Sequence, residues 1–284
     1  MLLTKHTTRQ GTRWAMDGHF LPPNLTLTTL LKLPNETMLQ LLNNLAKRGP
    51  AAGATAAPID PTQEVWAAGV TYLRSRDARR VESTVANMYD LVYEAARPEL
   101  FFKSVGWRVI GHKLPVHIRS DSHWNVPEPE LVLVINRHCE IIGYCAGNDL
   151  SSRDIEGENP LYLPQAKVYN GSCALGHGIL LCEPQEIKEI PIRLRIERAK
   201  QIMFEGETTT ATMKRTLSEL VQYLTRELDF PDGVFLMTGT CLVPGDQFTL
   251  HSGDMVSIQV GALTLENRVE AQSRNRFTGA VDGQ

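Results

Sequence analysis

Residues 128–149 hold the feature that most restricts what this chain can fold into, namely acidic side chains that border apolar strands. Glu128 and Glu130 stand two apart just before the run Leu131–Ile135, which is apolar at every position. Alternate residues of a strand point to the same side, so both carboxylates project from one face. A run that is apolar on both faces is typical of a buried strand. Two carboxylates in such a place repel each other and require a cation.

A third carboxylate follows the next apolar run. Ile141–Tyr144 is a second strand-like segment, and Asp149 stands five residues after it. A hairpin or a crossover between the two strands would return Asp149 to the end of the sheet that carries the other two acids. Three carboxylates with coordination positions left open suit a hard divalent ion such as Mg²⁺ or Mn²⁺. The alternative is a solvated strand edge followed by an acidic turn.

The rest of the chain predicts a small N-terminal domain over residues 1–60 and a larger domain over residues 61–284. Thr37–Lys47 has apolar residues at helical spacing, with Asn35 as the expected N-cap, and an alanine- and proline-rich linker follows it. Beyond residue 64, short apolar runs alternate with turn residues, which is typical of a sheet-rich domain. Helices are expected over residues 74–96 and Met213–Glu227. The predicted fold class is therefore α+β, dominated by strands.

Composition and motifs exclude several classes of partner. The 29 basic and 32 acidic residues leave a net charge of −3, so nothing in the charge favours a nucleic acid or a membrane as partner. The longest apolar runs are too short to cross a bilayer. Five cysteines with no CxxC pair argue against a disulfide framework and favour a reducing cytoplasm. The spacing of His112, His117 and His123 fits no compact zinc motif, and no nucleotide-binding glycine loop is present.

Several segments together resemble the fumarylacetoacetate hydrolase family. They are PEPELVLVIN from residue 127, GYCAGNDLSSRD from residue 143, Lys167 after GENPLYLPQ, GETTTATMKRTLSEL from residue 206, Thr238-Gly239-Thr240 and Ser252-Gly253-Asp254. The similarity runs from about Val65 to Val269. It implies a mixed β-sandwich roll that forms a homodimer or homotetramer. It also implies that Glu128, Glu130 and Asp149 bind Mg²⁺, Mn²⁺ or Ca²⁺.

Two further matches indicate a branch of the family. In the segment GVTYLRSRDAR, Ser75 stands where the hydrolase members carry a histidine that activates water, and a serine cannot take that proton near neutral pH. This segment, PELFFK from residue 98 and the position of Lys167 look like the 2-keto-3-deoxy-D-arabinonate dehydratase branch. There, the residues that match Glu99 and Lys167 act as the acid/base pair, and the sequence leaves open which is the acid.

The resemblance thus implies a Mg²⁺-dependent hydro-lyase that dehydrates a 2-keto-3-deoxy-pentonate, a small 2-oxo sugar acid, to 2,5-dioxopentanoate. The residues expected around the substrate are Arg74, Ser75, Phe101, Phe102 and Thr240. A C–C bond hydrolase of acylpyruvate type is the alternative within the family. A binding protein without activity is the alternative outside it, and the intact acid/base pair weighs against that reading. The configuration at C4 stays open.

Overall fold

The computed structural model describes residues 1–45, 48–73 and 86–271, and within them it contains a mixed sheet of eleven strands. The strands run in the order β3-β2-β1-β13-β10-β9-β16-β5-β6, and β12 pairs with β10 and β4 with β1. Their bounds are β1 Leu2–Thr8, β2 Gly11–Met16, β3 His19–Phe20, β4 Thr55–Ala56, β5 Glu64–Gly69, β6 Glu99–Val105, β9 Pro129–Ile135, β10 Ile141–Asp149, β12 Cys173–Leu175, β13 Ile179–Leu181 and β16 Val234–Met237.

A second sheet of five described strands has the order β15-β14-β17-β18-β7, and a separate pair joins β8 to β11. Their bounds are β7 Val116–Ile118, β8 Asn125–Val126, β11 Ser151–Ser152, β14 Pro191–Arg198, β15 Gln201–Thr209, β17 Met255–Val260 and β18 Leu263–Ala271. Along β14 the residues alternate between exposed and buried, which is the pattern of a strand with one face in solvent.

The two sheets pack around one hydrophobic core, in which β9 and β10 contact β14, β17 and β18. Every residue of β9 and β10 is buried, as the apolar run Leu131–Ile135 predicts. The antiparallel hairpin that they form pairs Glu130 with Gly147. The β-dominated sandwich expected from the sequence is therefore confirmed, and its most deeply buried hairpin is the one that carries the acidic residues.

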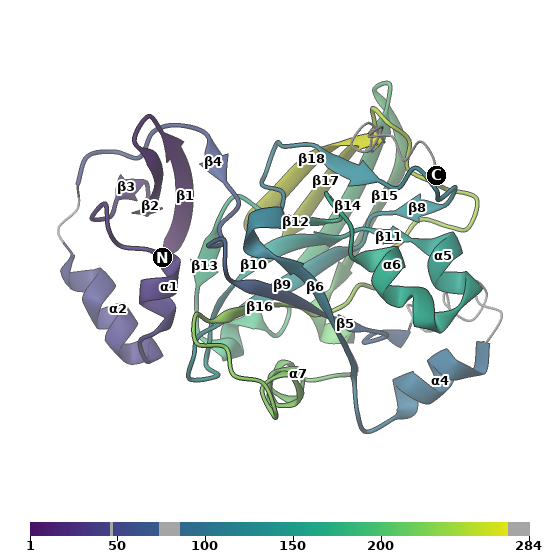
Figure 1. Ribbon diagram of the computed structural model, residues 1–284, viewed down its shortest axis with the longest axis horizontal. Coiled ribbons are helices and arrows are strands. Elements are labelled where there is room, and N and C mark those ends of the chain that lie inside the picture. Colours follow the sequence, from purple (N-terminus) through teal and green to yellow (C-terminus); the bar gives the residue numbers. More distant parts are fainter. Residues whose placement is uncertain (46–47, 74–85, 272–284) are drawn as a thin grey trace, which may run out of the picture.

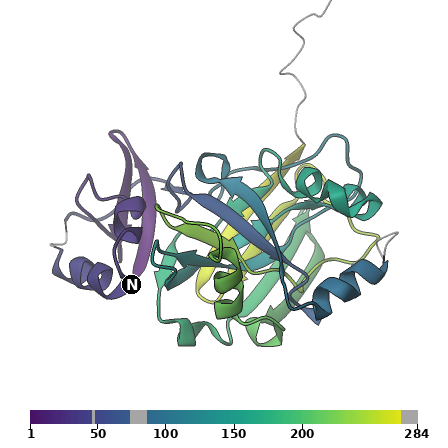
Figure 2. The same ribbon diagram turned by 60° about the horizontal axis from the view of Figure 1, so that its bottom comes forward.

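The N-terminal residues lie beside the larger body and extend its sheet. Figures 1 and 2 both show the purple segment, with β1–β3 and the first two helices, at one side of the molecule. β1 pairs antiparallel with β13, placing Leu2 opposite Leu180. Part of the predicted linker forms β4, and the buried Lys5 side chain donates to the Ile59 carbonyl oxygen at 2.6 Å. The division at residue 60 stays a prediction.

Short helices cover the ends of the sheets. They are α1 Leu27–Leu31, α2 Asn35–Asn44, α4 Ala86–Glu94, α5 Arg153–Glu158, α6 Leu163–Lys167 and α7 Leu217–Leu224, with 3-10 turns η1 Gly106–Arg108, η2 Pro160–Tyr162, η3 Pro184–Ile187 and η4 Thr210–Thr212. Figure 1 shows α5 and α6 together at the end of the molecule opposite the N-terminal segment. None of the helices in the described ranges is long and apolar enough to span a membrane.

Two helix boundaries differ from the sequence prediction. α2 begins at Asn35, which is therefore the first helical residue and not its cap; the backbone N–H of Asn35 donates to Glu140 Oε2 instead. α7 begins at Leu217 because the Thr216 side chain caps it, accepting from the Glu219 N–H at 3.1 Å. The first part of the helix expected over residues 74–96 lies outside the described residues.

Candidate active site

Three buried carboxylates meet where β9 begins and β10 ends. Because the two strands form an antiparallel hairpin, Asp149 stands across from Glu128, and the Asp149 N–H donates to the Glu128 carbonyl oxygen at 3.0 Å. Oxygen atoms of Glu128, Glu130 and Asp149 all lie within 4.8 Å of one another, and each residue is at most 3% exposed. The convergence expected from the sequence is present, and it arises from a hairpin.

Three buried cations surround these acids. Lys167, the last residue of α6, donates to Glu128 Oε2 at 2.7 Å and to Asp149 Oδ2 at 3.0 Å. Arg153, the first residue of α5, donates to Glu128 Oε1 at 2.9 Å. Lys103, from β6, lies with its ammonium 2.5 Å from Asp149 Oδ1. Glu128 and Asp149 are thus held from two sides each, which offsets part of the cost of burying them.

Glu130 is held differently. Its Oε2 accepts the backbone N–H of Gly239 at 2.6 Å, and within the described part of the chain no ion pair neutralises it. Burial raises the pKa of Glu130 well above its ordinary value, and the charges of Asp149 and Glu128 raise it further. A buried carboxylate in this state favours either a proton or an additional cation nearby.

The donor set fits a divalent metal ion. Octahedral coordination at about 2.1 Å places ligand oxygens roughly 3 to 4.2 Å apart, and the three carboxylates already approach that spacing. Hard oxygen donors of this kind suit Mg²⁺, Mn²⁺ or Ca²⁺. Such an ion would replace the proton that burial favours on Glu130.

A small cavity of about 20 Å³, room for about one water, opens onto these carboxylates. Lys167 and Glu99 both line it, so the structure brings the expected acid/base pair to the expected metal ligands. Glu99 packs closely over Gly69, where an added Cβ would lie 2.0 Å from Glu99 Oε2. Among the residues that the structure describes, the lining consists of Ala68, Gly69, Val70, Glu99, Phe101, Glu128, Glu130, Asp149, Glu156, Leu163, Lys167, Gly239 and Thr240.

The residues expected around the substrate fall into three groups. Phe101 and Thr240 line the cavity, and the Phe101 ring centre lies 6.0 Å from the Lys167 ammonium. Phe102 does not belong to the lining and packs edge-to-face on Trp66, because neighbours on a strand point to opposite faces. The expectation that Phe102 contacts the substrate stays a prediction. Arg74 and Ser75 lie outside the described residues.

Three further side chains belong to the site, and the sequence analysis assigned none of them to metal binding or to catalysis. Lys103 is fully buried and holds Asp149, Arg153 holds Glu128, and Glu156 lines the cavity from α5. The position of each of these residues in the sequence carried a signal. Lys103 stands in the strand of Glu99 and Phe101, at positions that alternate toward the site, and the other two follow Asp149 in one short segment.

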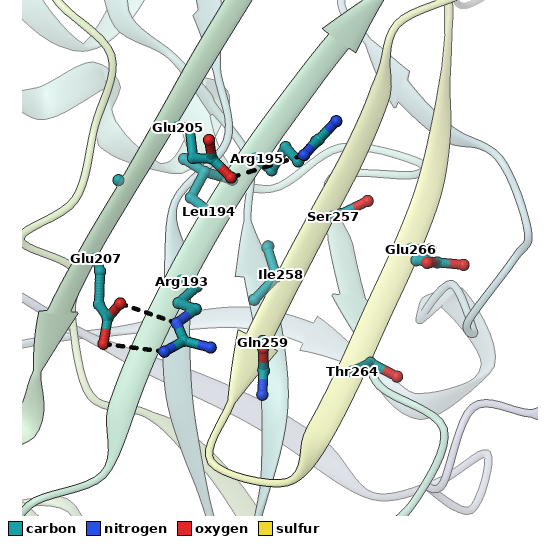
Figure 3. Close-up of a pocket in the computed structure, with 11 residues that line it drawn as sticks. Arg193, Leu194, Arg195, Glu205, Glu207, Ser257, Ile258, Gln259, Thr264 and Glu266 are labelled. Carbon is teal, nitrogen blue, oxygen red and sulfur yellow. Dashed lines mark hydrogen bonds and ion pairs between the residues drawn. The ribbon is translucent and has the colours of Figure 1, made fainter. Parts of the chain in front are cut away.

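A much wider cavity of about 540 Å³ lies elsewhere, on the solvent face of the second sheet. Figure 3 shows its side chains standing out from neighbouring strands, with Arg193 paired to Glu207 and Arg195 to Glu205. The Arg193 Nε to Glu207 Oε2 distance is 2.9 Å, and both side chains are more than half exposed. Exposed charges paired across strands are typical of a solvated sheet face, so the smaller, buried cavity is the candidate active site.

Comparison with known proteins identifies the family of the chain. Residues 64–270 match the family model described as fumarylacetoacetate (FAA) hydrolase C-terminal. The chain belongs to the fumarylacetoacetate hydrolase family.

Similar proteins carry related names. A Haloferax volcanii protein named probable 2-keto-3-deoxyxylonate dehydratase is 46% identical over 214 residues, 75% of this chain and 73% of that protein. The 2-dehydro-3-deoxy-D-arabinonate dehydratase of Saccharolobus solfataricus is 44% identical over 211 residues, 72% of this chain and 70% of that protein. A solved structure of 2-keto-3-deoxy-D-arabinonate dehydratase complexed with magnesium and 2,5-dioxopentanoate has a TM-score of 0.82 and 32% identity, covering 96% of this chain and 100% of the other.

Proposed function

We propose that this protein is a hydro-lyase that removes water from a 2-keto-3-deoxy-pentonate and forms 2,5-dioxopentanoate, also called α-ketoglutarate semialdehyde. One observation carries the proposal: three buried carboxylates share a cavity with Lys167 and Glu99. The names of the two relatives at 44% and 46% identity support the same reaction.

Glu128, Glu130 and Asp149 would hold a divalent cation, with Mg²⁺ as the first choice and Mn²⁺ or Ca²⁺ as alternatives. When bound, such an ion supplies a Lewis acid that draws electron density from the C2 carbonyl of a 2-oxo acid and so acidifies the hydrogens on C3. Arg153, by binding Glu128 Oε1, and Gly239, by binding Glu130 Oε2, orient two of the carboxylates.

The chain's own acid/base groups carry the proton transfers. In our assignment the Lys167 amine takes a proton from C3, and the Glu99 carboxyl group gives a proton to the C4 hydroxyl, which leaves as water. Phe101 and Thr240 line the cavity beside these groups. Arg74 and Ser75 are proposed to contact the substrate's polar groups. A dehydration of this kind needs no activated water, which is consistent with a serine at position 75.

The test compares two substrates by the mass of their products. With Mg²⁺ present, we expect the protein to convert a 2-keto-3-deoxy-pentonate into a product lighter by one water, and to leave an acylpyruvate intact. Addition of water to the acylpyruvate, followed by its cleavage, would instead assign the protein to the C–C bond hydrolases. The D and L isomers at C4, supplied separately, identify the sugar-acid series.

We further propose that the chain acts in the cytoplasm as a homodimer or homotetramer. The resemblance to the fumarylacetoacetate hydrolase family supports this self-association. Light scattering on the purified protein should give a mass that is a multiple of the chain mass, and a monomer would contradict the proposal.

A further inference from the structure

The proposed dehydration requires more proton transfers than two groups at C3 and C4 supply. Loss of a C3 proton and of the C4 hydroxyl gives 5-hydroxy-2-oxopent-3-enoate, in which C3 and C4 are joined by a double bond. To reach 2,5-dioxopentanoate, a proton must leave C5. The electron pair of the broken C5–H bond then forms a C4–C5 double bond, the C3–C4 double bond moves to C2–C3, and the C2 oxygen takes up the negative charge. Protons are then added at C3 and C4, while the C5 hydroxyl loses its proton to become an aldehyde. This inference rests on the proposed function.

Of the ionisable side chains that line the cavity, one remains to catalyse the conversion of the unsaturated intermediate into the aldehyde. Six such residues line the cavity in the described part of the chain: Glu99, Glu128, Glu130, Asp149, Glu156 and Lys167. Three of them are the candidate metal ligands, and two are assigned to C3 and to the C4 hydroxyl. The sixth is Glu156, which the proposed reaction has not yet used.

Glu156 is built into the site from a separate element. It lies in α5, is 4% exposed, and accepts a hydrogen bond from Ser151 Oγ to its Oε2 at 2.6 Å. The same Oε2 lies 4.0 Å from Nε of Arg153, whose Nη2 binds Glu128 Oε1. Through Arg153, the position of Glu156 is coupled to that of a candidate metal ligand. A carboxylate that is fixed in this way at the cavity wall has the placement that a proton-transfer group needs.

We propose that Glu156 is a third acid/base residue, which removes the proton from C5 and returns it to the carbon chain, so that the unsaturated intermediate becomes the aldehyde. The substitution Glu156→Gln removes this capacity while its amide oxygen still accepts from Ser151. Glu158→Gln, on the exposed side of the same helix, is the matched control.

The experiment follows the unsaturated intermediate and the aldehyde by NMR, for wild type and for both variants, in the presence of Mg²⁺. We expect the Glu156→Gln variant to bind Mg²⁺ and to exchange the C3 hydrogens of 2-oxobutyrate like wild type, yet to form aldehyde at least about 100-fold more slowly and to accumulate the unsaturated intermediate. In wild type, substrate deuterated at C5 should slow aldehyde formation without slowing water loss. The control should resemble wild type throughout.

Three results would overturn the assignment. Aldehyde formation by Glu156→Gln at the wild-type rate removes Glu156 from the reaction, and so does equal accumulation of the unsaturated intermediate in Glu156→Gln and Glu158→Gln. Loss of Mg²⁺ binding and of C3 exchange in Glu156→Gln would make the residue a structural support only. The proposed function fails separately, when wild type itself forms no aldehyde from either C4 isomer.

Discussion

The side-chain ammonium of Lys103 lies 2.5 Å from the main-chain carbonyl oxygen of Lys167. The same ammonium binds the Leu150 carbonyl oxygen at 3.0 Å and forms an ion pair with Asp149. One fully buried lysine therefore ties the end of β10, which carries a candidate metal ligand, to the end of α6, which carries the proposed base.

Replacing Lys103 by methionine should strongly destabilise the metal-free protein. The variant leaves the charge of Asp149 and two carbonyl groups without this buried donor, and breaking a buried ion pair from one side costs about 3–5 kcal/mol of unfolding free energy. Added Mg²⁺ should recover part of that loss, since a bound cation neutralises Asp149 in the folded state alone. Urea denaturation with and without Mg²⁺ measures both effects.

Lys32→Met is the matched control for this substitution. Lys32 pairs with Asp232 at 3.1 Å, but its side chain is 47% exposed, so its removal should cost about 1 kcal/mol or less. Equal losses in the two variants would mean that Lys103 contributes no more than a surface lysine.

Gly69→Ala should reduce turnover while leaving metal binding intact. The added Cβ would lie 2.0 Å from Glu99 Oε2 and would displace that carboxyl group from its place in the cavity. Displacing a catalytic group by about 1 Å can cost about 100-fold in rate. Steady-state kinetics and Mg²⁺ calorimetry provide the two readouts. Gly245→Ala serves as the control, because nothing lies within 4 Å of its Cβ position, and unchanged turnover in Gly69→Ala would remove Glu99 from the mechanism.

The raised pKa of Glu130 predicts how stability depends on pH. The folded, metal-free protein keeps a proton on Glu130 that the unfolded chain releases once the pH passes about 4.5. The unfolded state then binds fewer protons than the folded one, so the unfolding free energy falls as the pH rises, until the pH reaches the folded-state pKa. Glu130→Gln lacks this titration and should show a flatter profile.

Denaturation in metal-free buffer between about pH 5 and pH 8 tests this difference. Near neutral pH, Glu130→Gln should be the more stable protein without metal, and it should gain less than wild type when Mg²⁺ is added. Parallel profiles for the two proteins, or an equal gain from Mg²⁺, would contradict the role given to Glu130.

Lys167→Met should separate metal binding from proton transfer. The Lys167 ammonium donates to both Glu128 and Asp149, so it competes with a cation for those carboxylates. We expect the variant to bind Mg²⁺ at least as tightly as wild type, as measured by calorimetry, and to lose exchange of the C3 hydrogens. Undiminished exchange would exclude Lys167 as the base.

Local sequence patterns predicted the two strands of the site but left open whether a hairpin or a crossover joins them. The uninterrupted apolar run before Asn136, with two acids at its start, predicted a buried strand that carries two carboxylates. The second apolar run predicted the partner strand. The structure joins the two strands by a hairpin, which places Asp149 across from Glu128. Resemblance, not pattern, added Lys167 and Glu99, since a lysine at the end of a five-residue helix and a glutamate at a strand start carry no local signal of catalysis.

The parts that were missed depend on contacts between distant segments. Lys103 and Glu156 are ordinary charged residues until folding buries them, and Gly239 binds Glu130 only because β16 pairs with β9. Phe102 lies outside the cavity lining because the phase of the β6 strand is set by its pairing with β5, which contains a bulge. Strand phase and long-range burial are properties of the assembled sheet.

Exchange of the C3 hydrogens of 2-oxobutyrate in D₂O, followed by NMR, tests the central claim most directly. The compound has the 2-oxo acid group but no C4 hydroxyl, so it reports activation at C3 alone. We predict that wild type catalyses exchange with Mg²⁺, stops when a chelator removes the metal, and resumes when Mg²⁺ is restored. Exchange at the same rate in the metal-free protein would contradict a metal-assisted proton transfer at Glu128, Glu130 and Asp149. Absence of exchange in the Mg²⁺-loaded protein would contradict it as well.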